Sequence, residues 1–177
     1  MMTPDLIPVL LAETPRWIES QRHTHRPSGI PIPEPHLAGL LPFFRPATIE
    51  RVRVTSVRTI ENPGFFATLG STPMDLRRSA GITYGDTVLI SEAHAGWPPS
   101  LSLLFHEMVH VVQFALLGVP RFSEEYVLGW AQNGRDYFRI PLEVQAYDLQ
   151  REFDRGTLPE GPIESMVAAT LTRVGTV

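Results

Sequence analysis

Cysteine and lysine are both absent from this chain of 177 residues, and the first absence excludes several kinds of chemistry. Without cysteine there are no disulfide bonds, no thiol catalysis and no cysteine-ligated zinc. A fold without disulfides suits a cytoplasmic protein, so we expect that location. The 15 basic residues are all arginine, and the net charge is −4. This mildly acidic balance argues against nucleic acid or an anionic membrane as the main partner.

Long hydrophobic runs are also lacking. We find no apolar run that reaches the roughly 18–20 residues needed to cross a bilayer. The N-terminal stretch MMTPDLIPVLLAETPRW has no basic residue before its apolar part, and Asp5 and Pro8 interrupt it. It therefore does not match a signal peptide. We expect a soluble protein with no membrane partner.

Charged residues are few, at 19%, whereas hydrophobic residues make up 43%. This composition favours a folded core over disorder, and the length favours one compact domain. Residues 1–46 are expected to form an N-terminal helix, over 9–20, and a proline-rich arm, over 27–46. Six prolines in the arm predict extended or turn-rich structure without helix. The main domain is expected over 47–177.

Two segments have the composition of strands. ERVRVTSVRTI, residues 50–60, alternates valine with arginine, and GDTVLIS, residues 85–91, is a second apolar run. Helical segments are expected from Ser100 or Ser102 to about Leu117, from an N-cap at Ser123 to Gly134, from Pro141 to Gly156, and over 162–174. Strands followed by helices predict an α+β fold, with a small β-sheet packed on a helical half.

The segment LLFHEMVHVVQ, residues 103–113, places two histidines and a carboxylate in an otherwise apolar helix. His106 and His110 are four residues apart, so they lie on one face, one turn from each other. Two imidazoles placed in this way can bind one tetrahedral zinc ion, and Glu107 beside them can reach a metal-bound water. The alternative is a pair of core histidines satisfied without metal, with Glu107 at the surface.

A catalytic zinc ion needs a third protein ligand, and no histidine follows His110 to supply it. We therefore expect an acidic residue from a later helix. The candidates are Glu124, Glu125, Asp136, Glu143, Asp148 and Glu152. Glu143 is preferred because it follows Pro141 at the start of an apolar helix, where small Ala146 allows close approach to the histidines. Its alternative role is to match the positive end of the helix dipole.

These motifs resemble the gluzincin branch of zinc metallopeptidases, which combines H-E-x-x-H with a later P-x-E-x-x-A segment. HEMVHVVQF together with PLEVQAYDL is similar to small, mostly uncharacterised bacterial zincin-like domains, and the resemblance covers residues 85–153. It implies a zincin-like fold and one zinc ion bound by His106, His110 and Glu143. Tyr147 departs from the pattern, because larger gluzincins often carry an aspartate there to hold a histidine.

The resemblance implies a metalloendopeptidase that cleaves a peptide or protein substrate. Glu107 would act as the base that takes a proton from zinc-bound water and passes it to the leaving amine. The carbonyl oxygen of the substrate becomes negative and needs a hydrogen-bond donor. Tyr137 is the first candidate for this donor, followed by Tyr147 and Tyr126. The alternative for such a tyrosine is a packing role.

Further expectations concern the surroundings of the site. In zincins the strand before the metal helix borders the cleft, so GDTVLISEA, residues 85–93, could pair with a substrate through a free edge. We expect the arm over 27–46 to pack near the cleft and limit entry; alternatively, it completes the core or is flexible. Gln113 could support the histidines or merely lie on a polar face. His94 is expected in a loop.

Three other functions remain open at the level of sequence. The chain could be a regulatory peptidase that cuts one specific partner, a catalytically silent metal-binding module for assembly or sensing, or a purely structural helical domain. An intact Glu107 argues against the silent module, since such a site has no need of a base.

Overall fold

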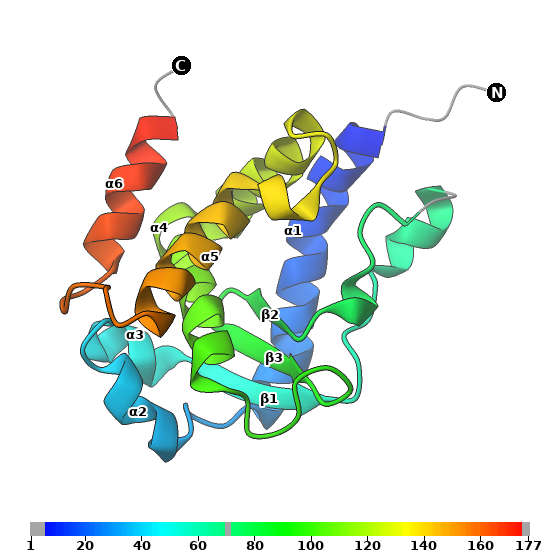
Figure 1. Cartoon of the computed structure of the whole chain (residues 1–177). Coiled ribbons are helices and arrows are strands. Elements are labelled where there is room, and N and C mark those ends of the chain that lie inside the picture. Colours follow the sequence, from blue (N-terminus) through cyan, green and yellow to red (C-terminus); the bar gives the residue numbers. More distant parts are fainter. Residues whose placement is uncertain (1–5, 70–71, 175–177) are drawn as a thin grey trace.

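The computed structural model describes residues 6–69 and 72–174, which form a small sheet and a set of helices (Figure 1). The strands are β1 (Arg53–Val57), β2 (Gly81–Tyr84) and β3 (Thr87–Ser91). The α-helices are α1 (Leu6–His25), α2 (Glu34–Leu40), α3 (Pro46–Arg51), α4 (Leu101–Gln132), α5 (Pro141–Asp154) and α6 (Glu164–Val174). The predicted α+β fold, with a small sheet against a helical half and a long central helix, is confirmed.

β3 is the middle strand of the sheet, with β1 parallel to it on one side and β2 antiparallel on the other. β2 and β3 form a hairpin with Gly85 and Asp86 in its loop. Gly85 has φ of +68°, a conformation that glycine adopts without a Cβ clash. The predicted strand over 85–91 is therefore a turn followed by β3. β2 itself is absent from the sequence-based prediction.

The segment predicted as a strand over 50–60 is shorter in the structure. Its first two residues end α3, and the strand occupies only Arg53–Val57. Val52 and Val54 are fully buried, as the alternating pattern indicates, while the arginines stay at least partly exposed. The short strand still contributes to the core because it pairs along its whole length with β3.

α4 carries the H-E-x-x-H segment and passes through the middle of the helical half (Figure 1). Ser100 caps its start by accepting a hydrogen bond from the Leu103 N–H at 3.2 Å. Gly118, with φ of +72°, kinks α4 and divides it into two helical halves. The predicted helix end near Leu117 therefore corresponds to this kink.

The second half of α4 starts earlier than predicted. Pro120 lies directly after the kink, and the chain is already helical when it reaches Ser123. The Ser123 hydroxyl is buried and donates to the Val119 carbonyl at 2.8 Å. The predicted N-cap at Ser123 is therefore wrong, because this hydroxyl bonds back into the helix rather than capping it.

Three other helices, α1, α5 and α6, agree with the prediction. α1 includes the predicted range 9–20 and is longer at both ends. α5 begins at Pro141, and Gly156 follows its end with φ of +66°. α6 lies within the predicted C-terminal helical segment.

The arm over 27–46 contains a helix, so the prediction that it has none is wrong. Pro35 is compatible with α2 because it occupies one of the first positions of the helix, where a missing N–H costs nothing. Ile32, Leu40 and Phe44 of the arm are buried in the main core. Ile30 also bridges to Val54 at the edge of β1. The arm is thus an ordered part of the hydrophobic core.

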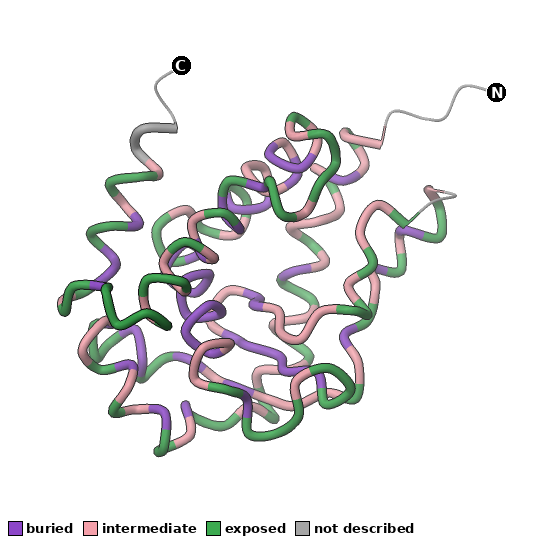
Figure 2. The backbone as a smooth tube through the Cα atoms, in the orientation of Figure 1, coloured by how far each residue is buried: buried purple, intermediate pink, exposed green. Residues whose placement is uncertain are grey.

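Buried residues concentrate along α4 and the strands below it (Figure 2). One core cluster joins the sheet, the first half of α4, the arm and α6, and a second joins α1, β2 and the second half of α4. By length and composition α4 could cross a membrane, but 61% of its most apolar 18-residue stretch is buried inside the protein. A buried core helix of a soluble protein can have the same length and composition.

Candidate metal centre

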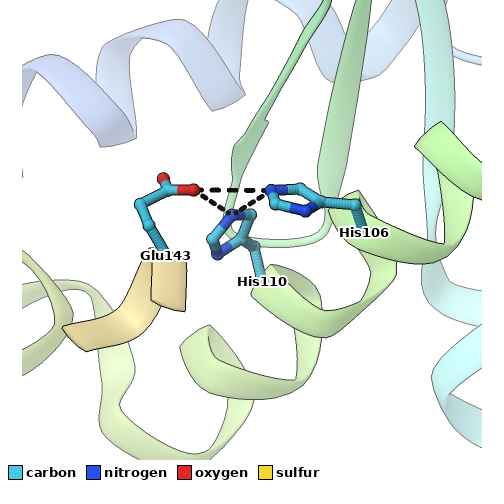
Figure 3. Close-up of side chains that lie close together, drawn as sticks. All are labelled: His106, His110 and Glu143. Atoms are coloured by element: carbon cyan, nitrogen blue, oxygen red, sulfur yellow. Dashed lines mark hydrogen bonds and ion pairs between the residues drawn. The ribbon is translucent and has the colours of Figure 1, made fainter. Parts of the chain in front are cut away.

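His106 and His110 lie on the same face of the first half of α4. Their Nε2 atoms are 3.1 Å apart, and both residues are buried, with 4% and 6% of their surface exposed. Glu143, in the first turn of α5, brings Oε2 to 3.4 Å from each Nε2 atom (Figure 3). The structure thus brings the three predicted ligands together in a buried group that could hold a metal ion.

The separations among these donor atoms suit a tetrahedral metal centre. Ligands about 2.0–2.1 Å from a zinc ion at tetrahedral angles lie about 3.3–3.4 Å from one another. The three observed separations are 3.1, 3.4 and 3.4 Å. Two imidazole nitrogens and one carboxylate oxygen also form a donor set that binds zinc with one position left open. The residues therefore fit one zinc ion.

Two glutamines fix the orientation of the imidazoles. Oε1 of Gln113 lies 2.8 Å from Nδ1 of His110, and Oε1 of Gln150 lies 3.0 Å from Nδ1 of His106. Each glutamine nitrogen donates to a main-chain carbonyl, at 2.9 Å and 3.2 Å respectively. Each glutamine oxygen therefore accepts a hydrogen bond from an imidazole Nδ1–H. This arrangement leaves both Nε2 atoms free to present lone pairs to the site.

Two lone pairs and a carboxylate repel one another at these distances unless a cation lies between them. Without metal, a proton takes this role. Burial lowers the pKa of His110, but the charge of Glu143 outweighs this effect and raises that pKa to about 9. In turn, burial raises the pKa of Glu143, but the histidines outweigh it and hold that pKa far below its usual range. The site is electrostatically prepared for a cation.

The second oxygen of Glu143 is held by a tyrosine. The Tyr126 hydroxyl donates to Oε1 at 2.7 Å, which leaves Oε2 to face the histidines. Oε2 itself is inaccessible to solvent and has no hydrogen-bond partner among the described residues, while both Nε2 atoms lie 3.4 Å from it. Tyr126, a lower-ranked candidate for the substrate donor, therefore already donates to a predicted metal ligand and orients it.

Glu107 lies beside the histidines, and β2 determines where its carboxylate sits. Thr83 donates to its Oε2 at 2.7 Å. A Cβ on Gly81 would lie 2.7 Å from its Oε1, so the carboxylate occupies space that only glycine leaves free. Burial raises the pKa of Glu107, while the two histidines and the Thr83 hydrogen bond oppose the rise. Glu107 is buried and oriented, as a base beside a metal would need to be.

Two hollows meet at Glu107. The inner cavity lies among α1, β2 and the second half of α4, and His110 and Glu143 form part of its wall. The outer cleft lies between the segment 73–81 and the side of the site that carries His106. Glu107 and Tyr137 line both hollows, so both residues could contact a molecule that enters either one.

The tyrosines near the site take different places. Tyr137 lies in the short turn before α5, and its pKa is raised, first by burial and then by Tyr126 and Glu143. It therefore keeps its proton and can donate a hydrogen bond, and its role as the substrate donor stays a prediction. Tyr147 packs its ring on His106, with centroids 4.5 Å apart.

The other acidic candidates for the third ligand do not join the histidines. Glu124 and Glu125 form ion pairs with Arg121 on the same helix. Asp136 accepts a hydrogen bond from the Phe138 N–H. Asp148 pairs with Arg151, and Glu152 is exposed.

Two expectations about access are wrong. The strand over 85–93 has no free edge, because β3 pairs on both sides, and β2 is the strand that contacts Glu107. The arm over 27–46 lines neither the inner cavity nor the outer cleft. Its apolar residues complete the core instead, and the N-terminal helix α1 borders the cavity in its place. His94 lies in a loop, as expected, and bonds to the Arg77 carbonyl.

Some residues that shape the site escape the sequence analysis. Gln150 could have been suspected because it lies seven residues after Glu143, on the same face of α5. Thr83 and Gly81 belong to β2, and the signal for that strand is the two-residue Gly85–Asp86 loop, a hairpin signature. Gln113 supports His110, which resolves the choice left open for it.

No family model, curated protein or solved structure matches this chain.

Proposed function

We propose that the protein is a zinc-dependent hydrolase that cleaves peptide bonds. The observation that carries the proposal is the triangle of two Nε2 atoms and one carboxylate oxygen, with sides of 3.1, 3.4 and 3.4 Å, next to Glu107. A metal site that only stabilises the fold needs no carboxylate base beside its ligands. Here such a base is present, and it borders two hollows where a substrate could lie.

His106, His110 and Glu143 would hold the ion, with Gln113 and Gln150 fixing the two rings. When bound, zinc lowers the pKa of a coordinated water towards about 7 and polarises a carbonyl group. The chain supplies the proton transfer. Glu107 accepts the proton of the attacking water and later delivers it to the leaving nitrogen.

The local structure suits Glu107 to this task. Thr83 occupies its Oε2, so Oε1 is the atom with freedom to accept a proton. Burial raises its pKa and thereby makes its conjugate acid easier to retain until the leaving group needs the proton. Tyr137 would donate to the carbonyl oxygen as negative charge develops there.

A second function is favoured by one observation. The three proposed ligands are almost completely buried, and they connect α4 to α5. A metal site that serves assembly or sensing would have the same two properties. A regulatory peptidase with a single protein partner is the narrower form of the main proposal. Cleavage of any substrate would separate the two peptidase functions from the metal site without turnover. The range of substrates that are cleaved would then separate a general peptidase from one with a single partner.

The test uses zinc-loaded protein and a mixture of unstructured peptides, with new termini detected by mass spectrometry. We expect the native protein to generate new termini and Glu107→Gln to generate none, because the amide keeps the shape but cannot accept the proton. Both proteins should contain equal amounts of zinc. Equal cleavage by the two would refute the general-base role. Full zinc occupancy without any cleavage of peptides or partner proteins would favour the silent module.

A further inference from the structure

The residues that line the inner cavity indicate which substrate side chain it can take. It encloses about 100 Å³, and its wall includes Leu10, Trp17, Ile18, Phe66, Phe114 and Trp130. An apolar cavity of roughly 150 Å³ is sufficient to bind benzene. At about 100 Å³ this cavity is smaller but of the same order, which suits a branched aliphatic side chain or a tightly held aromatic ring.

Charge is confined to one end of this cavity. Among the described residues of its wall, the only acids and imidazole are Glu107, His110 and Glu143, which belong to the metal site. The rest of the wall is apolar, aromatic or uncharged polar. A lysine, arginine or aspartate side chain whose charged end lay in the apolar part, away from Glu107 and Glu143, would lose its hydration there without an ion partner, at a cost of several kcal/mol. An apolar side chain would gain from leaving water.

The apolar wall begins at a metal ligand. Phe122 lies edge-on to His110, with centroids 6.3 Å apart, and stacks on Phe114 at 3.6 Å. It also stacks on Tyr126, the residue that holds Glu143, at 5.7 Å. A substrate group in this cavity would therefore lie next to the atoms that carry out hydrolysis, and its fit would position the adjacent peptide bond.

The outer cleft on the other side of Glu107 is different. Arg78 and Arg135 border it, and both are exposed and form no ion pair with a described residue. Charged parts of a substrate can remain hydrated there. The two hollows thus offer opposite environments to the groups on either side of a bond held at Glu107.

We propose that the inner cavity is the specificity pocket of the enzyme and takes one bulky apolar side chain of the substrate, leucine or phenylalanine in kind, next to the bond that is cleaved. This inference rests on the proposed function, because it names the substrate class of the same site. α1 has a functional role in this account: Leu10, Thr14, Trp17 and Ile18 form one wall of the pocket.

The pocket can be tested without turnover. The protein is zinc-loaded Glu107→Gln, and the probes are blocked pentapeptides with alanine at every position except a central glycine, leucine, phenylalanine, aspartate or arginine. Two of the three tryptophans, Trp17 and Trp130, line the pocket, so intrinsic fluorescence reports its occupation. We expect the leucine and phenylalanine peptides to bind at least about tenfold more tightly than the other three.

Matched variants test whether the preference for leucine and phenylalanine peptides arises in the inner cavity. Thr14→Phe places a ring in the pocket from a half-buried position on α1 and should remove the preference for leucine and phenylalanine. Arg16→Phe adds the same ring two residues away, at an exposed position that does not line the pocket, and should keep the preference. Phe66→Ala enlarges the pocket and should shift the preference from leucine towards the larger phenylalanine.

The outcomes separate this inference from the proposed function. Equal binding of the five peptides, no binding of any, or a preference unchanged in Thr14→Phe would overturn the pocket. Cleavage by the native protein without regard to the apolar residue would overturn the pocket and leave hydrolysis standing. Tight, Thr14-sensitive binding of apolar peptides without any cleavage would support the pocket and overturn the hydrolytic function.

Discussion

Metal binding at this site should release a proton, and the amount should depend on Glu143. Without metal, Glu143 raises the pKa of His110 to about 9, so at pH 7 to 8 the imidazole carries an extra proton between Nε2 and Oε2. Zinc needs the same lone pair and must displace that proton. Apparent zinc affinity should therefore rise about tenfold per pH unit from pH 6 to 8 and level off above about 9, each unit being worth about 1.4 kcal/mol.

The assay is calorimetry of zinc binding at pH 8 in buffers of different ionisation enthalpy, which counts released protons. Because the pKa of His110 lies near 9, this residue alone should contribute about one released proton per zinc to the count. The matched variant is Glu143→Gln, which keeps the shape and removes the charge. In its metal-free form, the His110 imidazole should titrate well below about 9 by NMR, because the two effects of Glu143 that raise its pKa are lost while burial still lowers it. Zinc affinity that is independent of pH between 6 and 8, with no proton released, would refute this account of the site.

Three further changes probe the surroundings of the ligands. Gln113→Ala should weaken zinc binding by about 10–100-fold in a chelator competition, because His110 loses the acceptor that orients its ring; unchanged affinity would mean that packing alone holds the ring. Gly81→Ala should keep zinc but reduce peptide cleavage, because its Cβ would displace the Glu107 carboxylate; full activity would show that Glu107 can move without loss. Tyr137→Phe should keep zinc and fold but lower kcat by about 10²–10³-fold; equal rates would leave Tyr137 with a packing role.

The main features of the site are predictable because they depend on local rules. The four-residue spacing of His106 and His110 fixes their common face, whatever the rest of the fold does. Glu143 is predictable because Pro141 marks the start of a helix and the apolar residues after it indicate that this helix packs on the core. In both cases a short segment of sequence contains the whole argument.

Features that depend on packing between distant segments are harder to predict. β2 has only four residues, and it is a strand because β3 pairs with it and Glu107 bonds to it. Serine is a residue type that often caps helices, but the second half of α4 begins just after the kink at Gly118, so Ser123 lies inside the helix. The arm is rich in proline, yet α2 forms within it because burial of Leu40 in the main core outweighs the local preference.

The central claim is that His106, His110 and Glu143 bind one zinc ion, and the metal content of protein purified without added metal tests it most directly. Inductively coupled plasma mass spectrometry should find about one zinc per chain in the native protein and very little in His110→Ala or Glu143→Ala. Circular dichroism should confirm that the variants remain folded. Native protein that neither contains zinc nor takes it up, or folded variants that retain as much as the native chain, would contradict the claim.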